Sequence, residues 1–351
     1  MSVNQTWATI SGDFLIAALL IYSLALLAFA GDFAFGRPRR ATTSRVVKER
    51  VAELATVGGG GSGGASFVGP DSDAGRPSAV LTESLPPARL SAWQSVSEAG
   101  NWVRTAIMLS VVGVTAHVVA VVARGLAVHR APWGNMYEFI TALTCIAALF
   151  FVYVMIRYRA WALGVFVMGA IVLALGLAET LIYTAAGPLV PALQSYWLSI
   201  HVTAMTLSTG IFFVAAVLGI LYLVAQRYRK RIAAGNADPN GLIARIPSPE
   251  QLDKLTYRAV IFGFPIWTFG VIAGAIWADQ AWGRYWGWDP VETWAFVTWV
   301  LYACYLHARA TAGWRGTASH VIQLLGFASL AANMLVVQVF LNGMHSYAGV
   351  G

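Results

Sequence analysis

Long apolar runs separated by short polar or basic segments make up most of this chain. Eight of the runs approach the roughly 20 residues that a helix needs to cross the hydrocarbon core of a bilayer. They occupy residues 13–30, 104–123, 135–156, 160–178, 201–226, 258–278, 291–308 and 319–341. The pattern therefore predicts an all-α fold, a polytopic membrane helical bundle of about eight transmembrane helices.

Basic residues cluster after every second predicted span. "GRPRR" and "RVVKER" follow the first span, "RYR" the third and "RYRKR" the fifth, and Arg309 and Arg315 follow the seventh. Lys and Arg are enriched in cytoplasmic loops, so this side is predicted to be cytoplasmic and both termini extracytoplasmic. The first apolar run has no basic n-region before it, which favours a retained helix over a signal peptide. We expect a multi-pass protein of the plasma membrane.

The overall composition agrees with this prediction. Of the 351 residues, 58% are hydrophobic and 11% are charged, more apolar surface than a soluble domain of this length can bury. Cytoplasmic loops account for the net charge of +7, and no nucleic-acid partner is expected. Three regions are predicted: an N-terminal transmembrane helix (1–35), a flexible Gly/Ser-rich cytoplasmic linker (36–100) and a main transmembrane domain (101–351).

The stretch "WGRYWGWDPVETWAFVTW", residues 282–299, places five tryptophans at the outer membrane surface. Tryptophans anchor proteins at bilayer interfaces, but an anchor needs only one or two, so this density favours an aromatic platform for a flat, apolar ligand. Asp289, Pro290 and Glu292 also form a helix start with a capping box, which explains them without a ligand. Arg284 is available for an acidic substituent of the ligand.

A second outer segment, "HRAPWGNMYEF", has similar features. Asn135 and Glu138 are predicted to cap the third span. Trp133 and Tyr137 are candidates to widen the aromatic platform.

Three of the six histidines are candidate ligands. His201 and His345 flank the face that carries the tryptophans, and two imidazoles from opposite sides would hold a haem iron while the indoles cover the macrocycle. His307 lies toward the inner leaflet. The alternatives are solvated interfacial histidines and, for His307, a side chain at the inner edge of the membrane. Packing or solvation explains His117, His129 and His320. No CxxC motif is present, so thiol redox chemistry is not indicated.

Several of these motifs resemble one family. "WGRYWGWDPVETW" resembles the WWD signature of haem-handling membrane proteins, and "LQSYWLSIHV", "LYACYLHAR", "FLNGMHSY" and "APWGNMYEF" are similar to segments of the CcsA/ResC proteins of System II cytochrome c biogenesis, called CcsB in actinobacteria. The resemblance covers roughly residues 100 to 351, a WWD haem-handling transmembrane domain. The first span and the linker lie outside it.

The resemblance implies a cytochrome c haem lyase (synthase) subunit that delivers and attaches haem. Haem b, as substrate and bound ligand, passes through the membrane and is presented at the extracytoplasmic WWD site to the CxxCH segment of apocytochrome c. A ResB-type membrane subunit is the implied partner. His201 and His345 are the implied outer iron ligands and His307 the inner one, with Arg284 also binding haem. The implied catalytic surface consists of Trp282, Trp286, Trp288, Asp289, Glu292 and Trp294.

Alternative functions remain open at this level. Val291 stands where many members of the family carry a lysine, and "WDPVE" is closer to the CcmF haem lyase of System I. A haem exporter would need the inner site but not both outer ligands. A b-type electron-transfer subunit would place paired histidines at matching depths in its spans, a pattern not evident here.

Overall fold

The structure, a computed structural model, describes residues 3–36, 100–188, 195–311, 313–337, 340–341 and 343–345. Within these ranges every regular element is a helix, as predicted. The long helices are α1 (Gln5–Phe35), α4 (Asn101–Val128), α5 (Met136–Tyr158), α6 (Gly164–Leu181), α7 (Tyr196–Ala233), α8 (Pro249–Trp282), α9 (Pro290–Thr311) and α10 (Thr317–Ala332). The short ones are η1 (Trp161–Leu163), η3 (Leu242–Arg245) and η4 (Asn333–Val337). Apart from its two end residues, the predicted linker at 36–100 lies outside the described residues.

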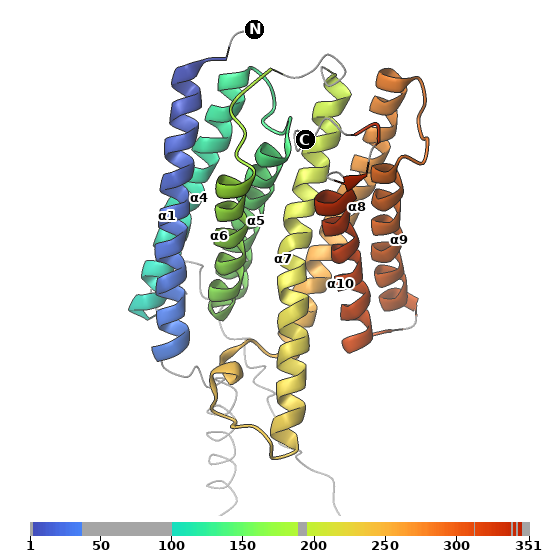
Figure 1. Cartoon of the computed structure of the whole chain (residues 1–351). Helices are drawn as coiled ribbons and strands as arrows, with labels where there is room; N and C mark the ends of the chain where they lie inside the picture. Colours follow the sequence, from blue (N-terminus) through green and yellow to red (C-terminus); the bar gives the residue numbers. More distant parts are fainter. Residues whose placement is uncertain are drawn as a thin grey trace, which may run out of the picture.

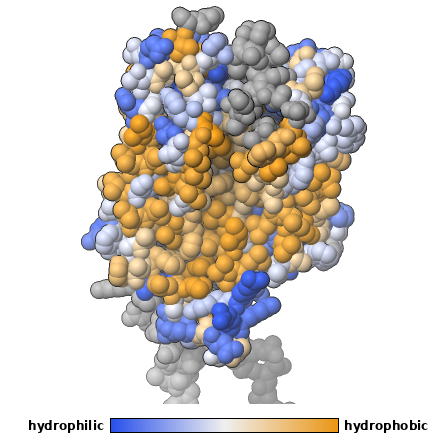
Figure 2. All heavy atoms as spheres, viewed as in Figure 1, coloured by the Kyte–Doolittle hydropathy of each residue, from blue (hydrophilic) through white to orange (hydrophobic). Residues whose placement is uncertain are grey.

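Seven of the described helices are long and apolar enough to cross a membrane, with η1 and η4 extending α6 and α10. The chain is therefore a multi-pass membrane protein. The remaining predicted span, 291–308, corresponds to α9, which has a similar length and packs against α8 and α10. Helix α9 has a more polar composition, and its polar side chains Thr298, Tyr302 and Tyr305 are buried inside the bundle. Figure 2 shows the apolar side chains as a broad band across the bundle, with hydrophilic residues gathered toward its two ends.

The helices form two groups that α7 joins (Figure 1). On one side, α1 packs along α4, and both contact a core that α5 and α6 complete. On the other side, α8, α9 and α10 surround a second core around Phe212, Trp267 and Tyr302. Helix α7 contributes to both cores and packs most closely along α8. The start of α1 and the end of α10 lie at the same end of the bundle.

The sixth span begins earlier than expected. It was predicted to start at residue 258, but α8 begins at Pro249. The hydroxyl of Ser248 accepts a hydrogen bond from the Gln251 backbone N–H at 3.3 Å, and Pro249 occupies the first helical position. These are ordinary helix-start signals. They were missed because the prediction followed hydropathy, and the first two turns of α8 are polar.

Helix α8 also runs further at its other end, beyond residue 278, where the sixth span was predicted to end. It ends at Trp282, where Gly283 adopts a left-handed conformation with φ 68° and its N–H bonds the Asp279 carbonyl oxygen. Glycine tolerates this conformation without steric cost. The sharp turn directs the tryptophan-rich segment back across the end of the bundle toward α9.

Candidate functional site

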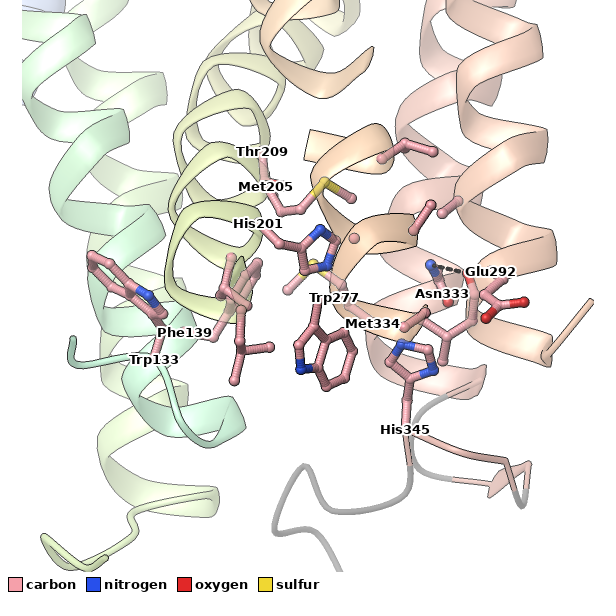
Figure 3. A pocket seen from close by; sticks show the side chains of 18 of the residues that line it. Trp133, Phe139, His201, Met205, Thr209, Trp277, Glu292, Asn333, Met334 and His345 are labelled. Carbon is pink, nitrogen blue, oxygen red and sulfur yellow. Dashed lines mark hydrogen bonds between the residues drawn. The ribbon is translucent and has the colours of Figure 1, made fainter. Parts of the chain in front are cut away.

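An apolar cavity of about 200 Å³ lies among α5, α7, α8, α9 and the end of α10 (Figure 3). Residues far apart in the sequence meet there, including Trp133 before α5, His201 on α7, Trp277 on α8 and His345 after α10. The two predicted outer histidines therefore line one cavity. The cavity lies at the end of the bundle where α1 begins.

His201 lies against the backbone of α8. Its Nδ1 is 2.7 Å from the carbonyl oxygen of Gly270. A carbonyl only accepts hydrogen bonds, so Nδ1 carries the proton and donates it, which leaves Nε2 with a free lone pair. Gly274, one turn further along α8, makes room for the ring, because a Cβ there would lie 2.6 Å from the His201 Cε1 and Nδ1 atoms. Gly274 thus leaves a notch in α8 for the His201 ring, and the Gly270 carbonyl orients it.

His345 is held by Asp289, which begins α9. The His345 Nδ1 lies 3.0 Å from Asp289 Oδ2, and the Met344 backbone N–H donates to Asp289 Oδ1 at 2.6 Å. The carboxylate again requires the proton on Nδ1 and leaves Nε2 free. Both histidines therefore have the tautomer that binds a metal through Nε2, each with a second partner that fixes the ring.

The carboxyl group of Asp289 has a lowered pKa and is therefore charged at physiological pH. Burial acts to raise its pKa, but hydrogen bonds from His345 and from the Met344 and Val291 N–H groups outweigh burial and lower the pKa to about 2. The unfolded value is higher, so the charged carboxylate favours the folded state above about pH 4, and this stabilisation is lost as the pH falls toward about 2. At physiological pH Asp289 remains an acceptor for His345.

The indole of Trp277 lies close to both imidazoles. Its ring centroid is 6.3 Å from that of His201, with the planes 14° apart, and 5.9 Å from that of His345. The imidazole centroids are therefore within about 12 Å of each other. Trp282 packs edge-on against both Trp277, at 4.7 Å, and His345, at 5.0 Å. The cavity thus brings two imidazoles together beside a flat aromatic wall.

The predicted capping box is confirmed and has additional contacts. Asp289 Oδ2 accepts from the Val291 N–H at 3.1 Å, and Glu292 Oε2 accepts from the Asp289 N–H at 3.1 Å. Glu292 Oε2 also accepts from the Gly287 N–H at 2.8 Å, and Arg284 pairs with the Glu292 carboxylate at 3.2 Å. Glu292 therefore fixes the whole tryptophan-rich turn. Arg284 is engaged by Glu292 and does not line the cavity.

The predicted aromatic platform is only partly assembled at the cavity. Trp282, Trp286 and Glu292 line it, whereas Trp288 and Trp294 do not. Trp288 is 64% exposed and packs edge-on against Trp286. Trp133 lines the cavity as predicted. Tyr137 does not, because its hydroxyl turns to Glu179 and donates a hydrogen bond at 2.9 Å.

His307 lies apart from this pair. It occupies the last turns of α9, toward the other end of the bundle, and its side chain is exposed. Exposed Phe296, Val300 and Cys304 share its face of the helix at spacings of three and four residues. The described part of the chain gives His307 no second ligand.

Glu138 stabilises the wall of the cavity that Trp133 provides. Its buried carboxylate accepts from Arg124 Nε at 2.9 Å, from Arg130 Nη1 at 2.7 Å and from the Gly134 N–H at 2.8 Å. The two arginines also donate to the carbonyl oxygens of Thr184 and Gly187. Asn135 caps α5 as predicted, accepting from the Glu138 N–H at 2.9 Å. The ion pairs of Glu138 were not predicted.

Replacing Glu138 by glutamine should destabilise the protein by about 3–5 kcal/mol, because it leaves two nearly buried guanidinium groups without their carboxylate. The Arg124 and Arg130 side chains are 9% and 14% exposed, and that of Glu138 is 0% exposed. Thermal unfolding of the purified protein measures the effect. Glu250→Gln is the control: its pair with Arg229 is more than half exposed on both sides and contributes about 0–1 kcal/mol. Equal losses in the two variants would contradict the role of Glu138.

Three parts of the site escaped sequence analysis. Trp277 lies in the apolar run of α8, where the sequence does not distinguish it from the other apolar residues of the span. Gly270 and Gly274 give only a spacing of four residues. Asp289 was predicted as a helix cap and as part of the catalytic surface, but nothing in the sequence pairs it with His345, 56 residues away. The spacing of the two glycines near an outer tryptophan is a signal that could have indicated a close contact between helices.

Two nitrogen ligands suit an iron that a macrocycle already holds in its plane. A bare zinc ion needs three or four protein ligands. Across the described residues, no group of three or more His, Cys, Asp or Glu side chains is placed to bind a metal ion.

Comparison with known proteins identifies the family of the chain. The family model for cytochrome C assembly protein matches residues 133–345, a range that includes both imidazoles and the whole tryptophan-rich turn. The chain therefore belongs to the cytochrome c assembly protein family, and its role is in cytochrome c maturation.

The relatives within that family carry the name cytochrome c biogenesis protein CcsA. That of Heterosigma akashiwo is 35% identical over 62% of this chain and 76% of its own length. That of Guillardia theta is 39% identical with the same coverage, and that of Gloeobacter violaceus is 32% identical over 71% of this chain and 86% of its own.

A solved structure shares the fold. The cytochrome c haem lyase CcmF superposes with a TM-score of 0.57 at 16% identity and covers 96% of this chain. The chain spans 47% of that protein, so the likeness concerns the fold alone. The relatives at higher identity are CcsA proteins, which leaves the CcmF-like alternative without support beyond the shared fold.

Proposed function

We propose that the chain binds haem b in the cavity and presents it to apocytochrome c as a haem lyase subunit of System II. The observation that carries the proposal is the pair His201 and His345, which line one apolar cavity, each with Nδ1 engaged by a protein acceptor and with Trp277 beside both. The two Nε2 atoms would hold the haem iron. The aromatic wall supplies the apolar surface for the macrocycle.

The chemistry that follows needs positioning more than acid–base groups. In each thioether bond the cysteine sulfur of CxxCH bonds one vinyl carbon, and the thiol hydrogen ends on the other, so no oxidant is consumed. Haem carries the reactive vinyl groups, and the protein contributes orientation and exclusion of water. His201 and His345 would fix the iron, and Trp277 and Trp282 would set the plane of the ring. Glu292 and Asp289 hold these groups in place.

The cavity would face the extracytoplasmic side of the plasma membrane. The basic run at the end of α7 and Arg309 on α9 lie at the opposite end of the bundle, which is the cytoplasmic end by the distribution of positive charge. Both termini would then be extracytoplasmic, in keeping with the start of α1 and the end of α10 at the cavity end.

Gly274 offers a direct test of the His201 geometry. Gly274→Ala should weaken haem binding by at least about tenfold, because the new methyl group displaces a ligand that a neighbouring backbone carbonyl orients. Titration followed at the Soret band measures the affinity. Gly176→Ala on α6 is the control, since a Cβ there meets nothing within 4 Å. Unchanged affinity in Gly274→Ala would contradict the placement of His201.

The exposed face of α9 supports a ResB-type partner. An imidazole facing lipid is costly, so His307 would be covered by a second membrane protein, which would supply the other ligand of an inner haem site. We expect His307→Ala to lower the haem content of the co-purified complex and the covalent haem on a co-expressed CxxCH cytochrome. Cys304→Ala, on the same face, should leave both unchanged. Normal haem content in the His307 variant would remove this residue from the route.

A further inference from the structure

The last turn of α10 departs from the α-helix. Residues Asn333–Val337 form a π-helix, which directly follows the α-helical part ending at Ala332. A π-turn accommodates an extra residue and is found mostly at functional sites. Here it turns two side chains, Asn333 and Met334, into the cavity that also holds His345 (Figure 3).

Asn333 links this π-helix to the first turn of α9. Its side chain is 6% exposed, and its Nδ2 donates to the carbonyl oxygen of Val291 at 3.2 Å. Val291 follows two residues after Asp289, which binds Met344 and His345. The segment from 333 to 345 is therefore attached to the start of α9 at both of its ends, by Asn333 at one and by Asp289 at the other.

The polar amide has an energetic cost in this position. The Asn333 Oδ1 atom is buried, and the described residues give it no hydrogen-bond partner. A leucine of similar size would avoid that cost in an apolar wall, since a buried polar atom without a partner is destabilising. Among the described residues the amide makes its hydrogen bond to Val291, and fixing the π-helix is the role that this bond gives an asparagine here.

We propose that Asn333 is a positioning residue of this cavity: its bond to Val291 fixes the π-helix from which the C-terminal segment leaves, and so fixes the His345 imidazole in the cavity that His201 also lines. The attachment itself needs no ligand. Its consequence for haem rests on the function proposed above.

Hydrogen exchange on the haem-free, full-length protein tests the attachment. The Met344 amide is protected by its bond to Asp289. Asn333→Leu should speed exchange of the peptide that contains Met344 by about an order of magnitude, because loss of one attachment raises the population of the open segment. Asp289→Ala gives the exchange rate of the fully released segment. An unchanged rate in Asn333→Leu overturns the proposal.

Thr298→Val is the matched control. It removes a 2.8 Å hydrogen bond between Thr298 and Ser329, which also joins α9 to α10 but lies outside the cavity lining. Exchange at Met344 should stay at the wild-type rate. If Thr298→Val speeds exchange as much as Asn333→Leu, general packing of the two helices explains the effect and Asn333 has no special role.

The haem-loaded protein provides the second readout. Asn333→Leu should keep its haem through His201 but lose part of the low-spin signal, and added imidazole should restore that signal. Wild-type spin state in a variant whose Met344 exchange is fast would show that the attachment does not set the ligand, which overturns the positioning role. Absence of haem from the wild-type protein would contradict the proposed function instead, while the exchange result would still decide the attachment.

Discussion

Replacing His201 or His345 by glycine should lower cytochrome c maturation by more than about 100-fold, since even the loss of a group that only orients a metal ligand costs about 10–100-fold. Each change removes one iron-binding nitrogen and leaves a space for a small ligand. Millimolar imidazole added to the cells should restore much of the activity by filling that space. Covalent haem on a reporter cytochrome with one CxxCH motif measures the result.

The matched control for this pair is His129→Asn. His129 is exposed at the end of α4, and its φ of 53° is a conformation that asparagine tolerates. Maturation should be unchanged. Normal maturation in a His201 and His345 double variant would remove both residues as ligands. Loss on changing His307 but not His345 would favour a protein that exports haem and leaves attachment to others.

Replacing Asp289 by alanine should weaken haem binding by about 10–100-fold, the usual effect of removing the partner that orients a metal-bound histidine. The variant loses the bonds to both Met344 and His345, so the ring is no longer held in position or in one tautomer. Titration of the purified protein with haem gives the affinity. The haem affinity of Asp289→Asn should lie between those of the wild type and of Asp289→Ala, because the amide keeps one acceptor oxygen.

Asp238→Ala is a suitable control for the loss of a carboxylate that accepts a backbone hydrogen bond. Asp238 accepts a hydrogen bond from the Asn240 N–H in an exposed loop at the opposite end of the bundle. Haem affinity should not change. Wild-type affinity in Asp289→Ala would show that the carboxylate serves only as a helix cap, as the sequence alone allows.

Much of the fold follows from hydropathy. Each of the eight apolar runs is helical over most of its described residues, because an apolar run in lipid satisfies its backbone hydrogen bonds within a helix. Boundaries were less accurate where polar residues continue a helix beyond the membrane. Helix α8 begins before its apolar run, at Ser248 and Pro249, and the capping signals there mark the true start.

The candidate site was predicted in part. Three residues predicted at the outer ends of spans do line one cavity: His201, His345 and Trp282. Trp277 and Gly274 were missed because their roles depend on α7 packing along α8. The hydrophobic pattern of one helix does not show which other helices pack against it. The link from Asp289 to His345 likewise depends on where the chain returns after α10.

Electron paramagnetic resonance of the ferric, haem-loaded protein in complex with its partner can detect the proposed ligation of one haem by two imidazoles beside Trp277. The wild type should give a low-spin bis-imidazole signal that becomes high-spin when His345 is replaced by glycine and returns with added imidazole. A wild-type spectrum preserved in both the His201 and the His345 single variants would show that these histidines do not bind the iron.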